Sequence, residues 1–325
     1  MKLRTVAELL SEKQTQIDIE VKGWVRTYRA NRFIAINDGS TINNIQCVVD
    51  FENFEEAILK RITTGAAIHI KGVLVESQGK GQRVEIQTTS IEILGDSDPE
   101  TYPIQPKKHS FEFLRENAHL RTRTNTFSAI MRLRSSLSFA VHKYFNENGF
   151  YNMHTPIITG SDAEGAGEMF RVSSLDSKKP PLTDDGNVDF AQDFFGKETN
   201  LTVSGQLEAE TYAMSLGKVY TFGPTFRAEN SNTSRHLSEF WMIEPEVAFM
   251  DIHGNMDLAE DFMKSVIGYV LENNKEDLEF LEQRLIQEDK SKPQAERSEM
   301  TLTDKLRFVV DHNFNRVTYT EAIEI

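Results

Sequence analysis

The chain has 325 residues and a formal net charge of −14, and 39% of its residues are hydrophobic. This length exceeds what one ordinary hydrophobic core needs, and it predicts two domains. No apolar run approaches the roughly 18 residues of a membrane-spanning helix, and the N-terminus has no targeting pattern. The only cysteine, Cys47, cannot form an internal disulfide. We therefore expect a cytoplasmic protein without membrane segments, with Cys47 a buried strand thiol.

The charge is unevenly distributed along the chain. Residues 1–94 carry twelve basic and twelve acidic side chains, so the acidic excess lies in the remainder. Residues 107–134 reverse that trend, with seven basic residues against two acidic ones. The net charge of −14 nevertheless argues against a protein that coats nucleic acid indiscriminately.

Residues 17–94 alternate strand-like and turn-like segments. The predicted strands are "IDIEVKGWVRTYR", "FIAINDGS", "NIQCVVD", "AIHIKGVLVES" and "VEIQTTSIEIL", with a helical "ENFEEAILKRI" between the third and the fourth. Five strands with one helix in this position predict an OB-fold barrel over residues 1–95. Aromatic and arginine residues alternate on its first strands, as in a groove for single-stranded nucleic acid. Taken alone, this segment favours a simpler interpretation, with Trp24 and Phe33 in the core.

A proline-rich connection over residues 96–120 precedes the second domain, predicted over residues 121–325. Apolar residues at one-face spacing predict a helix over 123–148, and Gly149 supplies its stop. The segment "FYNMHTPIITG" predicts a strand that Pro156 places at an edge or interface. Residues 174–197 predict a surface excursion. Two further helices are expected around 255–272 and 275–287, followed by a polar connector.

The most unusual stretch is "FRAENSNTSRHLSEFWMIEPE", residues 226–246. In its second half, the two-residue period of a strand separates an apolar face, with Trp241 and Ile243, from a face that carries Glu244 and Glu246. Pro245 implies a bulge or an unpaired edge. In the first half Arg227 lies two residues before Glu229, and a guanidinium is well shaped to hold a phosphate. Surface ion pairs alone do not explain acids that cluster opposite an apolar face.

This stretch resembles the second signature motif of class II aminoacyl-tRNA synthetases of the aspartyl, asparaginyl and lysyl subgroup. The segment "GFYNMHTPIITGSDAEGAGEMF" is similar to the first motif, with its dimer-interface proline at Pro156. The resemblance implies an α+β chain with an all-β N-terminal domain, an OB-fold for the anticodon, followed by an antiparallel-sheet catalytic core. It also implies ATP and Mg²⁺ as cofactors, tRNA and an amino acid as substrates, and a homodimer.

The resemblance also implies roles for individual residues. Arg227 and Glu229 are the catalytic pair: Arg227 would hold the ATP α-phosphate and Glu229 the adenine side. ATP would further contact Arg235, His236 and Phe240. The amino acid would be bound by Glu164, Gln206, Glu208, Glu244 and Glu246. In the barrel, the residues that would contact the anticodon are Arg26, Phe33, Gln46 and, as a weaker candidate, Glu85.

The stretch "LTVSGQLEAE" bears on the choice of amino acid. Aspartyl members place a lysine where this chain has Ala209, beside Glu208 and Glu210. Acids in place of a cation would repel aspartate and leave an acceptor for an amide NH₂, which separates two nearly isosteric substrates by charge. Together with the excursion before it, the stretch is similar to the asparaginyl members of bacterial type. An exposed face of an ordinary helix would explain Glu208 equally well.

The sequence has no counterpart of the family's glycine-rich third motif or of its later acidic magnesium ligands, so the metal ligands stay unassigned. We expect the catalytic domain to be partial, the chain to be C-terminally truncated, and the fragment to form no adenylate on its own. Three alternatives stay open: an aspartyl enzyme, an asparagine-making enzyme on the same core, and a non-catalytic RNA-binding paralogue.

Overall fold

The structure is a computed structural model that describes residues 3–79, 81–163, 165, 168–231, 233 and 235–325. The chain divides into two compact units, and both are discontinuous in sequence. Unit 1 comprises Met1–Ser136 and Val270–Arg307, and unit 2 comprises Leu137–Tyr269 and Phe308–Ile325. Helices α4 and α6 each contribute to both units. The domain boundaries expected from the sequence stay a prediction.

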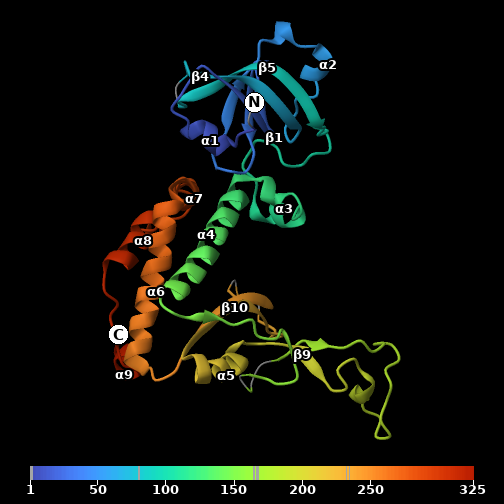
Figure 1. The fold of residues 1–325 in the computed structure, drawn as a ribbon, viewed down its shortest axis with the longest axis vertical. Coiled ribbons are helices and arrows are strands. Elements are labelled where there is room, and N and C mark those ends of the chain that lie inside the picture. Colours follow the sequence, from blue (N-terminus) through green and yellow to red (C-terminus); the bar gives the residue numbers. More distant parts are fainter. Residues whose placement is uncertain (1–2, 80, 164, 166–167, 232, 234) are drawn as a thin grey trace. The chain divides into compact units, whose positions relative to one another are not determined.

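Five strands of unit 1 form a closed barrel in the order β1-β2-β3-β5-β4 (Figure 1). The strands are β1 (Ile17–Arg29), β2 (Phe33–Asn37), β3 (Ile45–Val48), β4 (Ala67–Glu76) and β5 (Val84–Gly95). β3 and β5 pair in parallel, and the other pairs are antiparallel. Alternate positions along each strand fill an interior of Ile, Val and Leu side chains, with α1 (Val6–Ser11) packed on it. The predicted OB-fold is confirmed.

Two details of the barrel differ from the expectation. The helix between the third and fourth strands is short, with η1 (Phe51–Asn53) followed by α2 (Glu56–Leu59). Trp24 is 51% exposed, so its assignment to the core was wrong, because its strand position faces outward. Tyr28 instead packs against the barrel interior. Cys47 is fully buried, as predicted.

Helices complete unit 1 outside the barrel. They are α3 (Phe111–Glu116), η2 (Arg121–Arg123), the first half of α4 (Asn125–Glu147), the end of α6, all of α7 (Lys275–Asp289), η4 (Gln294–Glu296) and part of α8 (Leu302–Asp311). Arg132 of α4 donates to both carboxylate oxygens of Asp277 on α7, with Nη2 2.7 Å from Oδ1. Arg284 of α7 also donates to the Thr126 hydroxyl at 3.0 Å. These bonds join α4 and α7.

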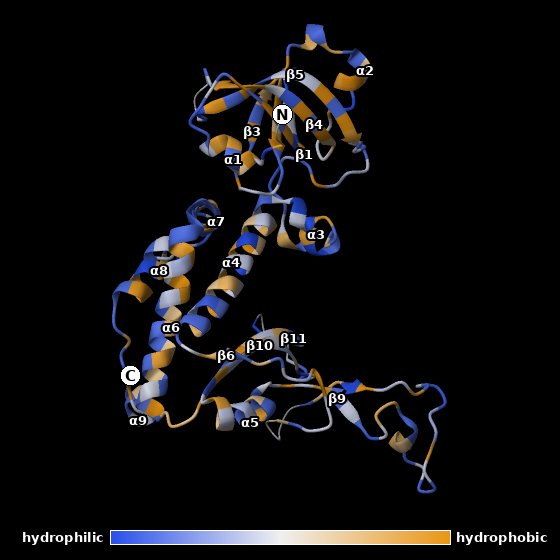
Figure 2. Cartoon of the chain, viewed as in Figure 1, coloured by the Kyte–Doolittle hydropathy of each residue, from blue (hydrophilic) through white to orange (hydrophobic). Residues whose placement is uncertain are grey.

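Unit 2 contains a three-stranded sheet in the order β11-β10-β6, formed by β11 (Glu239–Val247), β10 (Lys218–Phe226) and β6 (Tyr151–Asn152). Tyr220 of β10 stacks on Phe145 of α4, with ring centres 4.4 Å apart. Phe145 also stacks on Phe262 of α6 (Ile252–Asn273). Figure 2 shows that apolar and polar residues alternate along both helices. The expected long helix and its stop are confirmed, and Gly149 has a positive φ of 79°.

The β10-β11 register is unbroken from Lys218↔Val247 to Phe226↔Glu239. Pro245 pairs directly with Tyr220, and β11 lies at the edge of the described sheet. Of the two expectations for Pro245, the edge strand is therefore correct and the bulge is wrong. The apolar face of β11 is only partly covered: Val247 packs in the core, whereas Trp241 and Ile243 are 49% and 37% exposed. The apolar face predicted for this strand is therefore present but not fully buried.

The predicted strand over residues 150–160 is interrupted. β6 ends at Asn152 and β7 (Ile158–Thr159) begins after Pro156, because proline cannot donate to a ladder. β7 belongs to a second sheet of order β7-β9-β8, with β8 (Arg171–Val172) and β9 (Thr199–Leu201).

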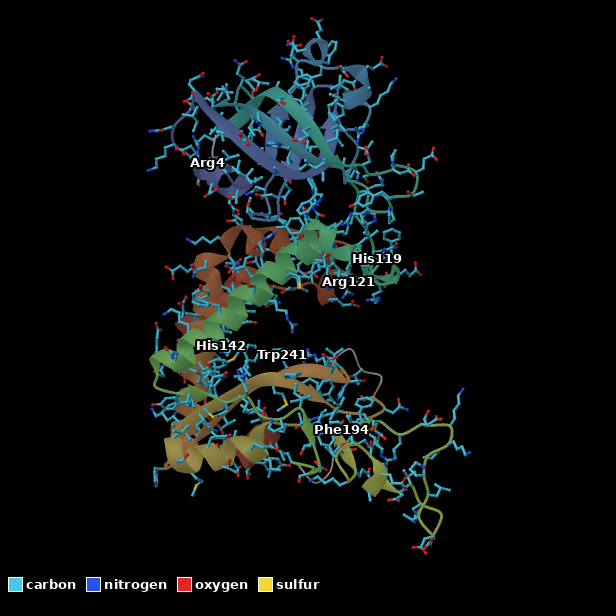
Figure 3. All side chains as sticks on the ribbon, turned by 45° about the vertical axis from the view of Figure 1, so that its right-hand side comes forward. Arg4, His119, Arg121, His142, Phe194 and Trp241 are labelled. Atoms are coloured by element: carbon cyan, nitrogen blue, oxygen red, sulfur yellow. The ribbon has the colours of Figure 1, made fainter. Side chains whose placement is uncertain are left out.

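The excursion over 174–197 is largely irregular and exposed, with η3 (Phe190–Gln192) inside it. Figure 3 shows Phe194 within it, and this side chain is 80% exposed. Asp193 is buried beside it and accepts from the backbone and hydroxyl of Ser174 and from the backbone of Phe194. The pKa of the Asp193 carboxyl lies well below its usual range, and the largest cause is hydrogen bonding from serine hydroxyls.

The two helices expected after residue 252 are confirmed as α6 and α7. The polar connector that was expected to follow also contains α8 and α9 (Tyr319–Glu324), which were not predicted. Among the described residues, no helix combines the length and the hydrophobicity that a membrane span needs.

Candidate functional site

The acidic face of the hairpin lies under helix α5 (Gln206–Leu216). Thr221 pairs with Glu244 and Val219 pairs with Glu246, and directly opposed residues of an antiparallel pair point to the same side. Val219 packs against Ala209 and Ala213 of α5. The start of α5 and the two glutamates therefore belong to one side of the sheet, and the aromatic core lies on the other.

Glu244 is held by three hydrogen-bond donors. Its Oε1 accepts from the Ser204 hydroxyl at 2.5 Å, and its Oε2 accepts from the Gly205 N–H at 3.1 Å and the Thr221 hydroxyl at 2.8 Å. A Cβ at Gly205 would lie 2.8 Å from the Thr155 hydroxyl, so the loop needs glycine to come this close. A carboxylate has about four acceptor positions. Glu244 is thus fixed in place, with one position left for a ligand.

Glu246 lies next to Glu244 along the same face. Burial is the largest cause that raises the pKa of the Glu246 carboxyl, and the negative charges of Glu210 and Glu244 raise it further. Gln206 donates to Glu210 at 2.9 Å across one turn of α5. A cluster of carboxylates of this kind would be stabilised by a cationic group such as an ammonium.

Arg227 follows directly on β10. Its N–H donates to the Ser238 carbonyl at 3.0 Å, which continues the hairpin pairing. Its guanidinium carbon lies 5.5 Å from the centre of the Phe240 ring, and its Nη2 lies 3.4 Å from the Val203 carbonyl. A half-buried guanidinium next to an aromatic ring suits a ligand that carries both a phosphate and a planar base. β10 ends at Phe226, so Arg227 lies directly after the strand and Glu229 lies in the connection that follows.

Other predicted ATP contacts lie on the turn of the hairpin. Glu229, Arg235 and His236 are all exposed. His236 is hydrogen-bonded through Nδ1 to the Thr233 hydroxyl. The predicted amino-acid ligand Glu164 lies outside the described residues.

Helix α5 distributes its residues between the core and the site. Gln206 and Glu210 are exposed and Glu208 is half-buried, whereas Ala209 is fully buried against Val219. Packing against the strand therefore also requires a small side chain at position 209. Pro156 is exposed in the break between β6 and β7, and Ile157 and Ile158 beside it are 43% and 40% exposed.

Three of the four predicted anticodon contacts come from neighbouring strands β2, β3 and β5. Gln46 donates to Glu85 Oε2 at 3.1 Å, and Ser77 and Gln82 donate to the same oxygen. The Phe33 ring is half-buried and lies 5.8 Å from the guanidinium carbon of Arg32. The fourth residue, Arg26, is engaged elsewhere: its guanidinium donates to the Arg123 carbonyl and to Asn125.

Sequence reasoning missed Ser204 and Thr221, the two hydroxyl donors to Glu244. Both are ordinary polar residues in sequence, and both are almost fully buried in the structure. Thr221 could have been found by aligning the two strands of the hairpin in register. Ser204 could not, because its loop reaches Glu244 only in the folded chain. Among the described residues, no group of three or more His, Cys, Asp or Glu side chains could hold a metal ion.

Comparison with known families agrees with both halves of the chain. The family "tRNA synthetases class II (D, K and N)" matches residues 110–325, and "OB-fold nucleic acid binding domain" matches residues 19–94. The asparagine–tRNA ligase of Cytophaga hutchinsonii is 57% identical over the whole chain, and that of Porphyromonas gingivalis strain W83 is 53% identical. The chain spans 68% and 67% of these two relatives.

Solved structures show the same fold. Asparaginyl-tRNA synthetase from Pyrococcus horikoshii, complexed with asparaginyl-adenylate, matches with a TM-score of 0.78 and 24% identity, over 100% of this chain and 66% of that one. The Entamoeba histolytica enzyme in complex with asparaginyl-adenylate matches with a TM-score of 0.67 over 82% of this chain and 58% of that one. With its fold, its hairpin and relatives more than half identical, the chain belongs to the asparagine–tRNA ligase family of class II tRNA synthetases.

Proposed function

We propose that this chain carries the adenylate-forming hairpin and the anticodon barrel of an enzyme that joins asparagine to its tRNA. The observation that carries the proposal is that one hairpin holds both a carboxylate fixed by hydrogen bonds, Glu244, and an arginine next to an aromatic ring, Arg227 beside Phe240. The comparisons support it, because the relatives that cover the whole chain bear the name asparagine–tRNA ligase.

The proposed reaction needs alignment and charge stabilisation rather than a nucleophilic side chain. The carboxylate of asparagine attacks the α-phosphorus of ATP, a new O–P bond forms, and pyrophosphate leaves with the electrons of the broken P–O bond. The terminal ribose hydroxyl of tRNA then attacks the carbonyl and releases AMP. Arg227 would hold the α-phosphate during the first step, and Phe240 would stack on adenine. Glu229, Arg235 and His236 would contact ATP from the turn.

Glu244 would accept one hydrogen bond from the ammonium of asparagine at its remaining acceptor position. Gln206, Glu208 and Glu246, with Glu164, complete the proposed amino-acid contacts. Magnesium, implied by the family resemblance, would neutralise phosphate charge when bound; its ligands stay unassigned among the described residues.

The acidic surroundings of the site would discriminate asparagine from aspartate. Aspartate would bring a second carboxylate close to Glu208, Glu210 and Glu246, whereas the amide NH₂ of asparagine can donate to them. We expect asparagine to be preferred over aspartate by about 10²-fold or more, because aspartate both adds a repelled negative charge and lacks the amide donor.

Binding of two non-hydrolysable adenylate analogues tests this proposal. We expect the asparaginyl analogue to bind this chain about 10²-fold more tightly than the aspartyl analogue. Arg227→Ala should weaken both analogues equally, since both carry the same phosphate. Equal affinities in the unmodified chain, or a preference for the aspartyl analogue, would contradict the assignment. Charging of tRNA with asparagine and aspartate side by side, in a protein extended to the length of the Cytophaga hutchinsonii relative, tests the full reaction.

For the barrel, we propose that Phe33 stacks on an anticodon base while Gln46 and Glu85 read its edge. Phe33→Ala should weaken tRNA binding by about 1–3 kcal/mol, the usual contribution of one stacked base. Phe51→Ala provides a matched control, because this barrel phenylalanine is also half-exposed but lies outside the strands. An equal loss in both variants would argue against the stacking role.

We also propose that the protein forms a homodimer through the exposed segment around Pro156. We propose further that it is cytoplasmic. The support is the run of exposed apolar side chains at Pro156, Ile157 and Ile158. Sedimentation of Ile157→Lys beside the unmodified chain tests the interface: the variant should sediment as a monomer and the unmodified chain as a dimer.

A further inference from the structure

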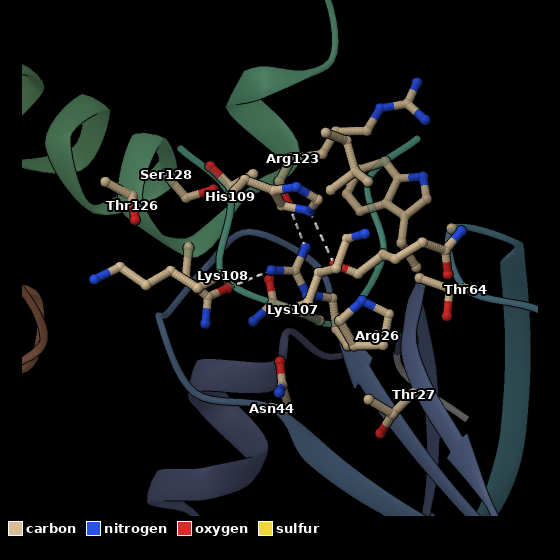
Figure 4. A pocket seen from close by; sticks show the side chains of 18 of the residues that line it. Arg26, Thr27, Asn44, Thr64, Lys107, Lys108, His109, Arg123, Thr126 and Ser128 are labelled. Atoms are coloured by element: carbon tan, nitrogen blue, oxygen red, sulfur yellow. Dashed lines mark hydrogen bonds between the residues drawn. The ribbon is translucent and has the colours of Figure 1, made fainter. Parts of the chain in front are cut away.

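Unit 1 contains a cavity of about 810 Å³ between the barrel and the segment that leads into α4. This volume is in the range of small-molecule sites. Figure 4 shows Arg26, Lys107, Lys108 and Arg123 gathered around it, with Asn44 reaching in from the barrel. None of the proposed synthetase contacts except Arg26 lines it. The proposed chemistry therefore leaves this cavity unexplained.

The charge of the cavity contrasts with that of the chain. Its described lining includes five Lys or Arg side chains and no Asp or Glu, in a protein with a net charge of −14. One of the five, Arg284, forms an ion pair with Glu288 at 3.0 Å. Within the described part of the chain, Lys107, Lys108 and Arg123 form no ion pair with any carboxylate. Several cations that face a common space without counter-ions create a positive potential there. The missing negative charges point to an anionic ligand.

Arg26 strengthens this argument. Its half-buried guanidinium donates to two neutral acceptors, the Arg123 carbonyl and the Asn125 amide oxygen. Burial, and to a lesser extent the charge of Arg132, lowers the pKa of Arg26, while Tyr102 acts in the opposite direction. Burying a guanidinium without a carboxylate is unfavourable, and an anion in the cavity would remove that cost.

The segment that carries the lysines is anchored at both ends. Ile104 and His109 are buried, and His109 Nε2 lies 3.1 Å from the Gln105 carbonyl. Lys107 and Lys108 lie between these anchors and are exposed. Their backbone is thus positioned in advance, and only the side chains must be ordered by a ligand.

The rest of the lining suits a planar, polar ring. Trp24 is 51% exposed and has no ring partner among the described residues. The buried side-chain oxygen of Asn44 has no hydrogen-bond partner in the described structure. An indole face favours stacking on a base, and an unsatisfied amide favours hydrogen bonds to its edge.

From these observations we propose that the cavity is a second ligand site, which binds a free nucleoside di- or triphosphate. The phosphates would contact Lys107, Lys108 and Arg123, and the base would stack on Trp24 with Asn44 at its edge. The site lies within unit 1 and does not depend on the proposed aminoacylation.

Tryptophan fluorescence provides a direct test, because the chain has two tryptophans and only Trp24 lines the cavity. In a Trp241→Phe background, ADP, GDP, CDP and UDP are titrated, with excitation at the red edge of indole absorption, where nucleotides absorb little. At least one of them should quench Trp24 with saturation below about 1 mM. Lys107→Gln/Lys108→Gln should weaken this binding about tenfold, the loss expected for charge-assisted hydrogen bonds. Lys178→Gln/Lys179→Gln, an adjacent exposed pair in unit 2, removes the same charge and should leave the affinity unchanged.

Four outcomes would overturn the proposal. One is the absence of saturable quenching by any of the four nucleotides, and another is equal weakening in both lysine double variants. A third is binding of pyrophosphate as tight as that of the nucleotides, which would leave no role for a base. The last is quenching by tRNA alone, which would make the cavity part of a tRNA path rather than a site for a free nucleotide.

Discussion

Glu244 shows at the scale of a single residue how the site is built. Its three donors come from the loop before α5 and from the facing strand β10, so the carboxylate joins two segments that are distant in sequence. A carboxylate that is already held loses little freedom when a ligand binds.

Replacing Thr221 tests this arrangement. Thr221→Val keeps the shape and removes one donor to the carboxylate, so the free energy of unfolding should fall by about 1–2 kcal/mol. Urea denaturation measures the change. Thr221→Ser retains the hydroxyl and is the matched control. A loss of the same size in the serine variant would assign the effect to packing of the methyl group instead.

Glu246 predicts a pH dependence. Its pKa is raised in the folded protein, first by burial and then by Glu210 and Glu244, so the native state binds this proton more tightly than the unfolded state does. Stability that depends on this group is therefore lost as the pH rises from the ordinary glutamate value of 4.5 through the raised one. Glu246→Gln should match the unmodified chain below that window and be the more stable of the two above it.

Thermal unfolding at several pH values tests the Glu246 prediction. Glu239→Gln, on the same strand but exposed, is the matched control for the loss of one carboxylate. A constant difference between Glu246→Gln and the unmodified chain across the pH range would show that charge is not the cause.

Individual residues were predictable where a pattern within one strand determines them. The alternation of β11 correctly placed Glu244 and Glu246 on one face. It could not show that Trp241 stays exposed, because coverage of a face depends on which helix lies over it. On β1, the sequence pattern likewise could not show that the Arg26 guanidinium donates to the carbonyl of Arg123, 97 residues away.

At the scale of elements, helix α5 must both pack against the sheet and present polar side chains to the site. Its buried side packs Ala209 and Ala213 against Val219, while Gln206 and Glu210 are exposed at the site. A lysine at position 209 would thus first meet the strand, whatever its effect on the substrate.

Ala209→Lys should therefore reduce the free energy of unfolding by about 3 kcal/mol or more, because a charge replaces a buried methyl group. Glu208→Lys introduces the same side chain at a half-buried neighbour and should cost much less. Chemical denaturation of both variants gives the comparison. Similar stabilities for the two would show that α5 can shift to expose position 209.

Elements were predicted well where they are long and amphipathic, as in α4, α6 and α7. The strand over residues 150–160 failed, because a proline divides it between two sheets and periodicity does not reveal which partner each half has. α8 was missed although its ten residues are amphipathic, and α9 was missed because six residues are too few to show a helical period.

At the scale of the whole molecule, the barrel is the self-contained part. Its core residues all lie between Val6 and Ile93, and the remainder of unit 1 is joined to it by hydrogen bonds such as that from Thr41 to Glu276 at 2.8 Å. The rest of unit 1, in contrast, is built from two stretches of the sequence, one before Leu137 and one after Tyr269.

A fragment of residues 1–98 should therefore fold on its own, with a cooperative urea transition and dispersed amide NMR signals. A fragment of residues 1–60 lacks β4 and β5, cannot close the barrel, and should stay unfolded. If the longer fragment also shows no cooperative transition, the barrel depends on the helices around it.

Cys47 gives the barrel a built-in chemical reporter. Its thiol on β3 is fully buried, and burial raises its pKa. While the barrel is closed, a reagent therefore cannot reach the sulfur, and the sulfur is not in its reactive thiolate form. Since the chain has one cysteine, any thiol labelling must come from this position. The rate at which a small alkylating reagent modifies the native protein thus measures how often the barrel opens, without interference from the motions of the rest of the chain.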